Sequence, residues 1–427
     1  MYKEISIYGA GVYGVLLALQ LINRDVIKSK GIKVNLYEKG PTIMPGWKSI
    51  SLGGHKFNSG FHGIEMPRAE EAFEGLSRVL GTASFTNISN YKLCMIDDMI
   101  VPFGEKNSLW PTPFKEEFQN LIEASALSKK STSEYCLSKL TDYKLGRIIE
   151  KCSYRYSDEL VNCWHSFYPW FYPSDFFNEE SDEGWLFRNP LTRNYDKPYY
   201  YTPSNGLFES LIEPLEKELQ ECGVNLIKNT TIDKSTLLSI TDQQETLPIW
   251  TASSAILLFL LNRDLASNLL SNKRYMNLVL LESLDDSLNK WLNSFSDKPS
   301  EVICINTSCS GLARISFPSD MNTVENIERH LLIEVIGTDK ELTSDSINEI
   351  ENAVFKSLGV NAKYSDHKMA RTLFTVSDSM IEEAQQFLTT EIEGLALDVP
   401  YSYWWPINIA KCGYASKKVA DMITSKL

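Results

Sequence analysis

The chain has 427 residues and a formal charge of −13 at pH 7, with 43% hydrophobic and 23% charged residues. This length exceeds the roughly 250–300 residues at which a single hydrophobic core stops growing, so we expect more than one closely connected domain. The negative charge argues against nucleic acid or an anionic membrane as the main partner, because both require clustered lysines and arginines. The composition is typical of a soluble globular enzyme.

The first forty residues have the order strand, glycine turn, helix, strand and acid. An apolar strand leads into Gly-Ala-Gly-Val-Tyr-Gly at residues 9–14, and a second apolar strand ends in Glu38. In a dinucleotide site Gly9 makes the tight turn, Gly11 lets the backbone approach a pyrophosphate, and Gly14 lets the helix close on the strand. The helix N-terminus attracts phosphate, and Glu38 is placed to accept hydrogen bonds from ribose hydroxyls. The alternative is an ordinary glycine turn in an α/β protein.

The eight cysteines are scattered, with no CxxC pair and no histidine at zinc spacing, so we expect reduced thiols and no metal site. No signal peptide precedes the glycine turn, because the first strand begins at residue 3. The most apolar later stretch, residues 255–261, is much shorter than the ~20 residues that a membrane span needs. We therefore expect a cytoplasmic protein with no membrane span.

The middle of the chain departs from the first pattern. Residues 69–80 have the spacing of an amphipathic helix. Residues from about 90 to 200 do not alternate strand and helix and are rich in aromatic side chains, which favours a substrate domain or cap. Residues 207–222 predict an amphipathic helix that Gly223 ends, followed by a strand at residues 224–227.

The later part of the chain predicts a second sheet. Residues 247–254 indicate a strand ending in small residues, with a serine capping the next helix. A charged helix is expected at residues 345–358. Several strands in close succession suggest an antiparallel sheet, and they are expected at residues 277–281, 302–306, 313–317 and 331–335.

The chain resembles the superfamily of flavin-containing amine oxidases, protoporphyrinogen oxidases and UDP-galactopyranose mutases. The likeness rests on the first unit, on Pro-Gly-Trp-Lys-Ser at residues 45–49 in place of a second glycine loop, and on the turn at residues 203–206. It rests also on the glycine-punctuated residues 57–65 and on the C-terminal segment 395–423.

The resemblance implies an α/β protein with a Rossmann-like FAD-binding domain assembled from discontinuous segments. An α+β substrate domain, with an antiparallel sheet and a helical cap, accompanies it. The expected FAD-binding segments are 1–90, 201–265 and 386–427; the cap is 91–200 and the substrate sheet is 266–385.

The resemblance also implies site residues. The expected FAD contacts are Gly9, Gly11, Val12, Tyr13, Gly14, Glu38, Lys39, Gly46, Trp47, Ser49, Gly60, Phe61, His62, Ile232, Thr251, Ala252, Asp398 and Asn408. The expected substrate contacts are Arg188, Arg193, Tyr199, Tyr201, Arg314 and Arg371. The candidate catalytic residues are His62, Arg193 and Tyr195.

Three functions follow from this resemblance. The first is an FAD-dependent oxidoreductase that takes a hydride from a small amine or sugar-derived substrate onto flavin N5. The second is a redox-neutral mutase of a UDP-sugar, in which arginines would bind the diphosphate. The third is a flavin-binding protein without turnover. The expected partners are a small-molecule substrate, which for the mutase is a nucleotide sugar, and a second copy in a homodimer.

Overall fold

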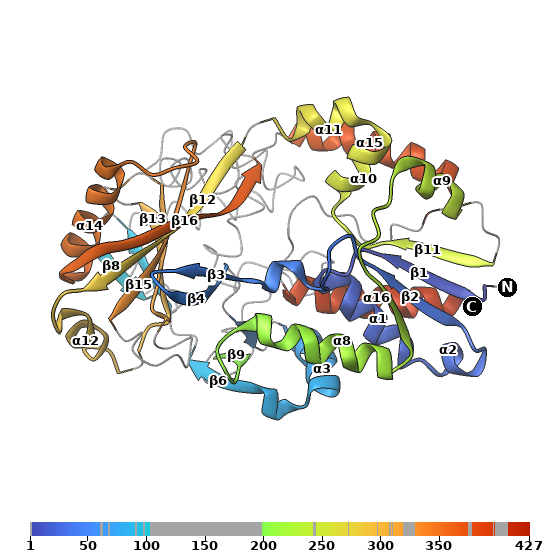
Figure 1. Ribbon diagram of the computed structural model, residues 1–427, viewed down its shortest axis with the longest axis horizontal. Helices are drawn as coiled ribbons and strands as arrows, with labels where there is room; N and C mark the ends of the chain where they lie inside the picture. The colour runs from blue at the N-terminus through green and yellow to red at the C-terminus, as the bar shows by residue number, and fades with distance from the viewer. Residues whose placement is uncertain are drawn as a thin grey trace, which may run out of the picture.

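The computed structural model describes residues 2–59, 63–66, 69–89, 92–96, 99–102, 199–241, 245–271, 273–296, 298–306, 309, 311–318, 329–374, 378–395, 397 and 409–427. Within these residues two main sheets stand apart, with a β-hairpin between them (Figure 1). The two ends of the chain lie close together on the parallel-sheet side (Figure 1).

A four-stranded parallel sheet forms the first region, in the order β10-β2-β1-β11. The inner strand β1 is buried from Ile5 to Tyr8, including the polar Ser6, because helices cover both faces of the sheet. The sheet brings together parts of the chain more than 200 residues apart, and this confirms the predicted mixed α/β class. Its strands are β1 (Glu4–Tyr8), β2 (Lys33–Tyr37), β10 (Val224–Ile227) and β11 (Thr246–Trp250).

Helices cover both faces of the parallel sheet (Figure 1). One face carries α1 (Val12–Ile22), α3 (Glu70–Leu80), α8 (Ile212–Glu221) and α16 (Ile409–Lys426). The other carries α9 (Lys234–Thr241), α10 (Ser254–Leu261), α11 (Arg263–Leu269) and α15 (Asp378–Leu395). As predicted, a serine caps α10: Ser253 accepts a hydrogen bond from the Ala255 N–H at 3.2 Å.

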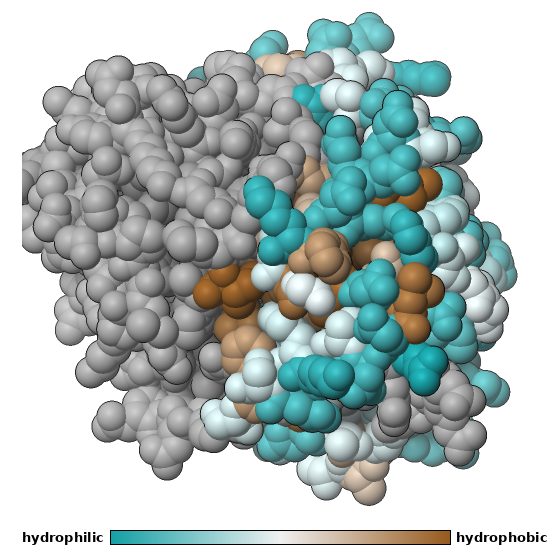
Figure 2. Space-filling model, turned by 90° about the vertical axis from the view of Figure 1, so that its left-hand side faces the viewer, coloured by the Kyte–Doolittle hydropathy of each residue, from teal (hydrophilic) through white to brown (hydrophobic). Residues whose placement is uncertain are grey.

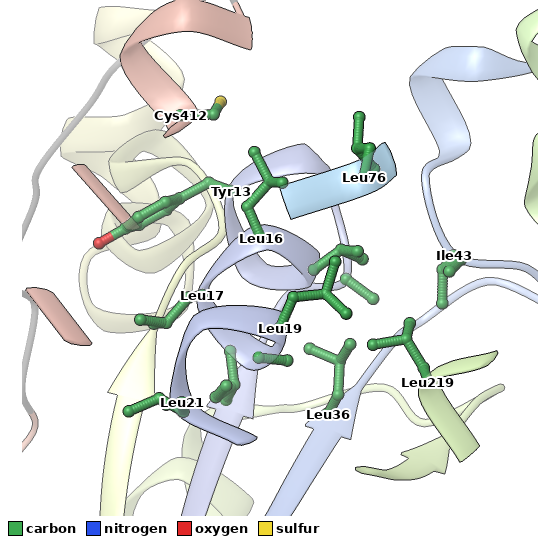
Figure 3. Packing of buried hydrophobic residues seen from close by; sticks show 14 of the residues in the cluster. Tyr13, Leu16, Leu17, Leu19, Leu21, Leu36, Ile43, Leu76, Leu219 and Cys412 are labelled. Atoms are coloured by element: carbon green, nitrogen blue, oxygen red, sulfur yellow. The ribbon is translucent and has the colours of Figure 1, made fainter. Parts of the chain in front are cut away.

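Small residues allow α1, α3 and α16 to pack closely. A Cβ atom on Gly413 of α16 would lie 2.5 Å from the backbone nitrogen of Ala72 in α3. A Cβ on Gly75 of α3 would lie 3.2 Å from the Leu16 side chain in α1. Figure 3 shows Leu16 in the same cluster as Cys412 of α16. The helix that follows the glycine turn is therefore held by two neighbouring helices.

A seven-stranded sheet forms the second region, in the order β16-β12-β15-β14-β13-β7-β8. Its strand pairs are antiparallel, except that β13 pairs with β7 in parallel. The strands are β7 (Lys92–Ile96), β8 (Met99–Pro102), β12 (Lys273–Ser283), β13 (Glu301–Asn306), β14 (Leu312–Ser316), β15 (His330–Gly337) and β16 (Ala362–Phe374). The four strands expected from the sequence all belong to this sheet, and so do β7 and β8, which the expected boundaries put in the cap.

The two faces of the second sheet have different neighbours. Helices α12 (Ser287–Leu292) and α14 (Ser344–Leu358) pack on one face. The hairpin of β3 (Ser49–Leu52) and β4 (His55–Asn58) packs on the other, through Ile50, Leu52 and Phe57. Because β3 follows the loop after β2, this hairpin leads from the parallel sheet to the second sheet (Figure 1).

A three-stranded sheet lies beside these regions, in the order β5-β9-β6. Its strands are β5 (Ile64–Met66), β6 (Phe85–Ser89) and β9 (Tyr199–Pro203). The shorter elements are α2 (Asp25–Ser29) and the 3-10 helices η1 (Pro45–Trp47), η2 (Thr82–Ser84) and η7 (Phe208–Leu211).

The described part of the surface at the α14 end is mostly hydrophilic, with hydrophobic residues grouped near its middle (Figure 2). Leu284 and Phe355 of the second region are among the exposed large hydrophobic residues, at 56% and 60% exposure. Within the described ranges, no helix combines the length and apolar character that crossing a bilayer would need.

Candidate functional site

Three strands of the parallel sheet end at one edge, and the predicted cofactor residues follow them directly. The backbone holds these ends together: the Gly9 N–H donates to the Tyr37 carbonyl and the Thr251 N–H to the Tyr8 carbonyl, both at 3.0 Å. From β1 the chain goes to β2 on one side and returns to β11 on the other. Ligands of open α/β sheets bind at such a point, beyond the carboxyl ends of the strands.

The three glycines of the turn have different surroundings. Gly9 has a φ of +116°, and a Cβ on it would lie 2.8 Å from the Ala252 nitrogen. A Cβ on Gly14 would collide with the Gly9 carbonyl oxygen and lie 2.8 Å from the Thr251 hydroxyl oxygen. A Cβ on Gly11 would meet no atom within 4 Å, and Gly11 is the N-cap residue directly before α1. Gly9 and Gly14 thus serve the turn itself, whereas Gly11 opens onto space at a helix N-terminus.

Glu38 faces the same turn. One carboxylate oxygen accepts a hydrogen bond from the Ala10 N–H at 3.1 Å, and the other accepts from the Gly40 N–H at 2.8 Å. A carboxylate offers about four acceptor positions, so two positions are left for ribose hydroxyls. Glu38 also shapes the glycine turn through Ala10. The neighbouring Lys39 side chain is exposed.

Thr251 and Ala252 lie behind the turn. The Thr251 side chain is 2% exposed, and its hydroxyl is within hydrogen-bond distance of the carbonyl oxygens of Gly9, at 2.8 Å, and Tyr8, at 3.1 Å. The Ala252 N–H donates to the Tyr8 carbonyl at 3.1 Å. These residues were predicted as cofactor contacts, and the structure places the Thr251 hydroxyl where it supports the turn.

The loop after Glu38 differs from the expected glycine pair. Met44 takes the left-handed conformation, with a φ of +51°. Its N–H donates to the Ala10 carbonyl at 2.8 Å. Gly46 is exposed, with no atom within 4 Å of a built Cβ. Trp47 is 2% exposed and packs on Phe208, with ring centroids 5.0 Å apart. Trp47 therefore packs in the core beside the loop, and its predicted cofactor contact stays a prediction.

Ser49 is also committed to the fold. Its hydroxyl donates to the Glu209 carboxylate, and its N–H donates to the same oxygen at 3.2 Å. Ser49 thus anchors β3 to η7, which contains Glu209, and its predicted FAD contact stays a prediction. Of the other predicted contacts, Val12 starts α1, and Tyr13 is 2% exposed and belongs to the core cluster of this face of the sheet. Ile232 packs on the cluster around α9 and α10.

Arg314 does not have the surroundings of a phosphate-binding arginine. Its guanidinium forms ion pairs with Glu301, at 3.0 Å, and with Glu334, and the three side chains are 1–6% exposed. Burial alone would lower the pKa of Arg314, but the charges of Glu334 and Glu301 raise it overall. The prediction that Arg314 binds substrate phosphate is corrected: its charge is paired inside the second sheet.

The tyrosines of β9 point in opposite directions. Tyr201, predicted as a substrate contact, stacks on Phe73 with centroids 3.9 Å apart. Tyr200, which is not among the predicted substrate contacts, donates its hydroxyl to Glu301 at 3.3 Å. The sequence contains a signal for this difference, because successive side chains of a strand point to opposite faces. The middle tyrosine of residues 199–201 must therefore face away from Tyr201.

The other predicted substrate and catalytic residues are more scattered. Arg371 is half-buried on the edge strand β16, opposite Met276. The backbone of Tyr199 begins β9. The predicted residues Gly60, Phe61, His62, Arg188, Arg193, Tyr195, Asp398 and Asn408 lie outside the described residues.

Comparison with known proteins gives no match to a protein-family model and no match among curated proteins. Solved structures do match over nearly the whole chain. A reduced UDP-galactopyranose mutase aligns with a TM-score of 0.62 at 13% identity, covering 100% of this chain and 95% of the other.

Two further solved structures match over both full lengths. A mutant of putrescine oxidase, made in a redesign of that protein's cofactor binding, aligns with a TM-score of 0.60 at 10% identity. A putative protoporphyrinogen oxidase from Exiguobacterium sp. 255-15 aligns with a TM-score of 0.57 at 14% identity. At such identities these likenesses show a shared fold, and it is the fold that the sequence resemblance predicts.

Proposed function

We propose that the chain binds FAD at the carboxyl edge of the parallel sheet and is a flavoenzyme. The observation that carries this proposal is the open space at Gly11, at the N-terminus of α1 and beside Glu38. The backbone at the start of α1 would hold the pyrophosphate, because helix N-terminal N–H groups and the helix dipole favour anions. Glu38 would accept hydrogen bonds from the adenosine ribose, and its negative charge disfavours a 2′-phosphate.

FAD is favoured over NAD by three features taken together, which are the loop at residues 45–49, the turn at residues 203–206 and the C-terminal segment 395–423. A simple nicotinamide dehydrogenase has no reason to carry all three. The loop returns to the glycine turn through the Met44 N–H, and the hairpin of β3 and β4 that follows packs on the second sheet. The bound flavin would supply the electron-accepting ring, and the protein would orient the substrate and exclude water.

The proposed reaction is oxidation of a small amine or sugar-derived substrate, with hydride transfer to the flavin. The alternative, a redox-neutral mutase of a nucleotide sugar, needs cations for a diphosphate. Of its four candidate arginines, Arg314 is already paired with two buried carboxylates. The pairing at Arg314 favours the oxidoreductase, and Arg188, Arg193 and Arg371 stay candidates for an anionic substrate.

Anaerobic mixing of the FAD-loaded protein with amines and nucleotide sugars, followed by the flavin absorbance, separates these functions. We expect loss of the absorbance near 450 nm with an oxidisable substrate. Turnover of a nucleotide sugar only after dithionite reduction would support the mutase instead. A bound flavin that responds to neither treatment would indicate binding without turnover. Replacing both Arg188 and Arg193 by alanine should weaken binding only if the substrate is anionic.

A further inference from the structure

Strand β9 contacts both regions of the molecule through opposite faces. Tyr201 stacks on Phe73 of α3 with an interplanar angle of 7°, and both pack against the core under the parallel sheet. Tyr200 is 6% exposed, and its hydroxyl donates to Glu301 of the second sheet. Because adjacent side chains of a strand point to opposite faces, one short strand joins the two cores.

The second-sheet end of this connection is held in place by charge. Arg314 stands directly opposite Glu334 in the β14–β15 pair and diagonal to Glu301 across the β13–β14 pair. Separating these buried ions would leave a charge without compensation, which is strongly unfavourable. Glu301 is therefore a well-fixed acceptor for the Tyr200 hydroxyl.

Packing also fixes Tyr200 at its other side. A Cβ on Gly63, just before β5, would lie 2.8 Å from the Cβ and Cγ atoms of Tyr200. The ring of Tyr200 therefore covers Gly63 closely, and a movement of the ring would move the entry to β5. Strand β5 is paired with β9, with Ile64 opposite Tyr201.

The other end of the connection reaches the helix of the proposed cofactor site. Phe73 belongs to α3, and Gly75 of the same helix lies under Leu16 of α1. Leu16 and Leu76 are both fully buried in this contact (Figure 3). Because Gly11 is the N-cap of α1, a displacement of α1 by α3 would move the N–H groups that face the proposed pyrophosphate position.

We propose that Tyr200 is a positioning residue of the cofactor site, which passes the fixed position of Glu301 through β9 and α3 to α1 and so sets the affinity for FAD. This inference rests on the proposed FAD site. It predicts energetic coupling between the triad of Glu301, Arg314 and Glu334 in the second sheet and a cofactor bound at the carboxyl edge of the parallel sheet. The basis of the proposal is spatial connection: Tyr201, next to Tyr200 on β9, stacks on Phe73, and Gly75 of the same helix packs on Leu16. The measurements below test whether this connection carries coupling energy.

The test uses the full-length chain after FAD removal. The variants are Tyr200→Phe, Glu301→Gln and the double substitution, and the measurements are the FAD dissociation constant and the Tm with and without FAD. We expect each single variant to bind FAD about fivefold or more weakly, at the lower end of typical coupling between sites. The double variant should be no weaker than the weaker single variant, because both changes break one connection.

Tyr364→Phe is the matched control. The Tyr364 hydroxyl lies 2.9 Å from Nδ1 of His367 on β16, and the residue is 38% exposed. Removing this hydroxyl takes away a tyrosine hydrogen bond in the seven-stranded sheet, to which Glu301 also belongs, and leaves β9 unchanged. We expect its FAD dissociation constant to equal that of the wild type.

Two results would have different meanings. An unchanged dissociation constant in Tyr200→Phe, with the Tm lowered equally with and without FAD, would overturn the positioning role and leave a structural hydrogen bond. A wild-type protein that does not bind FAD would refute the proposed cofactor site itself. If Glu301→Gln does not fold, Phe73→Leu breaks the connection at its other end and should also weaken FAD binding.

Discussion

The carboxyl edge of the parallel sheet and the buried ion pairs of the second sheet use polar groups in different ways. The edge is built from backbone groups and small residues, with Glu38 as the carboxylate that faces the turn. The second sheet instead buries Arg314 and two glutamates side by side, where their charges compensate one another. The first region therefore uses backbone groups and one carboxylate around an open turn, whereas the second uses its charges to compensate one another inside the fold.

The largest expected effect comes from the buried charges. Arg314→Met leaves Glu301 and Glu334 without their shared cation, so we expect the free energy of unfolding to fall by about 3–5 kcal/mol. Urea unfolding of the wild type and the variant measures this. Arg263→Met is the control, because Arg263 is exposed beside Phe259 and should cost at most about 1 kcal/mol. Equal losses for both arginines would contradict the distinction between the two regions.

A smaller effect is expected from the glycines of the turn. Gly14→Ala places a methyl group against the Gly9 carbonyl and the Thr251 hydroxyl, and overpacking of this kind costs about 1–3 kcal/mol. Gly11→Ala places the methyl group in open space, so the FAD-free protein should lose little stability. Thermal unfolding of the two variants without FAD measures the difference. The same Tm for both would mean that the turn does not pack as described.

The smallest effect concerns an exposed acid at the start of α9. The Thr236 N–H donates to Asp233 at 2.7 Å, and this bond, with those of the Thr236 and Ser235 side chains, lowers the pKa of Asp233 to about 2. A lowered pKa means that the acid stabilises the fold above its usual pKa near 4 and loses this contribution as the pH falls toward 2. The Tm difference between wild type and Asp233→Ala should therefore be constant above pH 4 and shrink below it. A difference that grows on acidification would contradict this capping role.

The sequence predicts the first region well because its requirements are local. All parts of the motif lie within 35 residues: the glycine turn, the strand before it, the helix after it and Glu38. The geometry of the motif restricts the residue type at its key positions. The loop that follows is less predictable. Met44 takes the left-handed conformation there, although the sequence pointed to Pro45 and Gly46.

Side-chain direction limits what the sequence can predict about the rest of the site. Trp47, Ser49 and Thr251 stand at expected places along the chain, yet their polar or aromatic groups face the fold. Arg314 could be taken for a phosphate ligand because its glutamate partners are 13 and 20 residues away on neighbouring strands. Such pairings depend on strand register, which no short motif specifies.

The central claim is that the edge at Gly11 binds the pyrophosphate of FAD. Titration of the FAD-free full-length protein with FAD, followed by flavin fluorescence, tests it most directly when wild type and Gly11→Val are compared. We predict saturable binding by the wild type, and for Gly11→Val an unchanged Tm without FAD together with loss of binding, because the valine fills the space that the pyrophosphate needs. Equal affinity of the two proteins for FAD, or absence of binding to the wild type, would contradict the account.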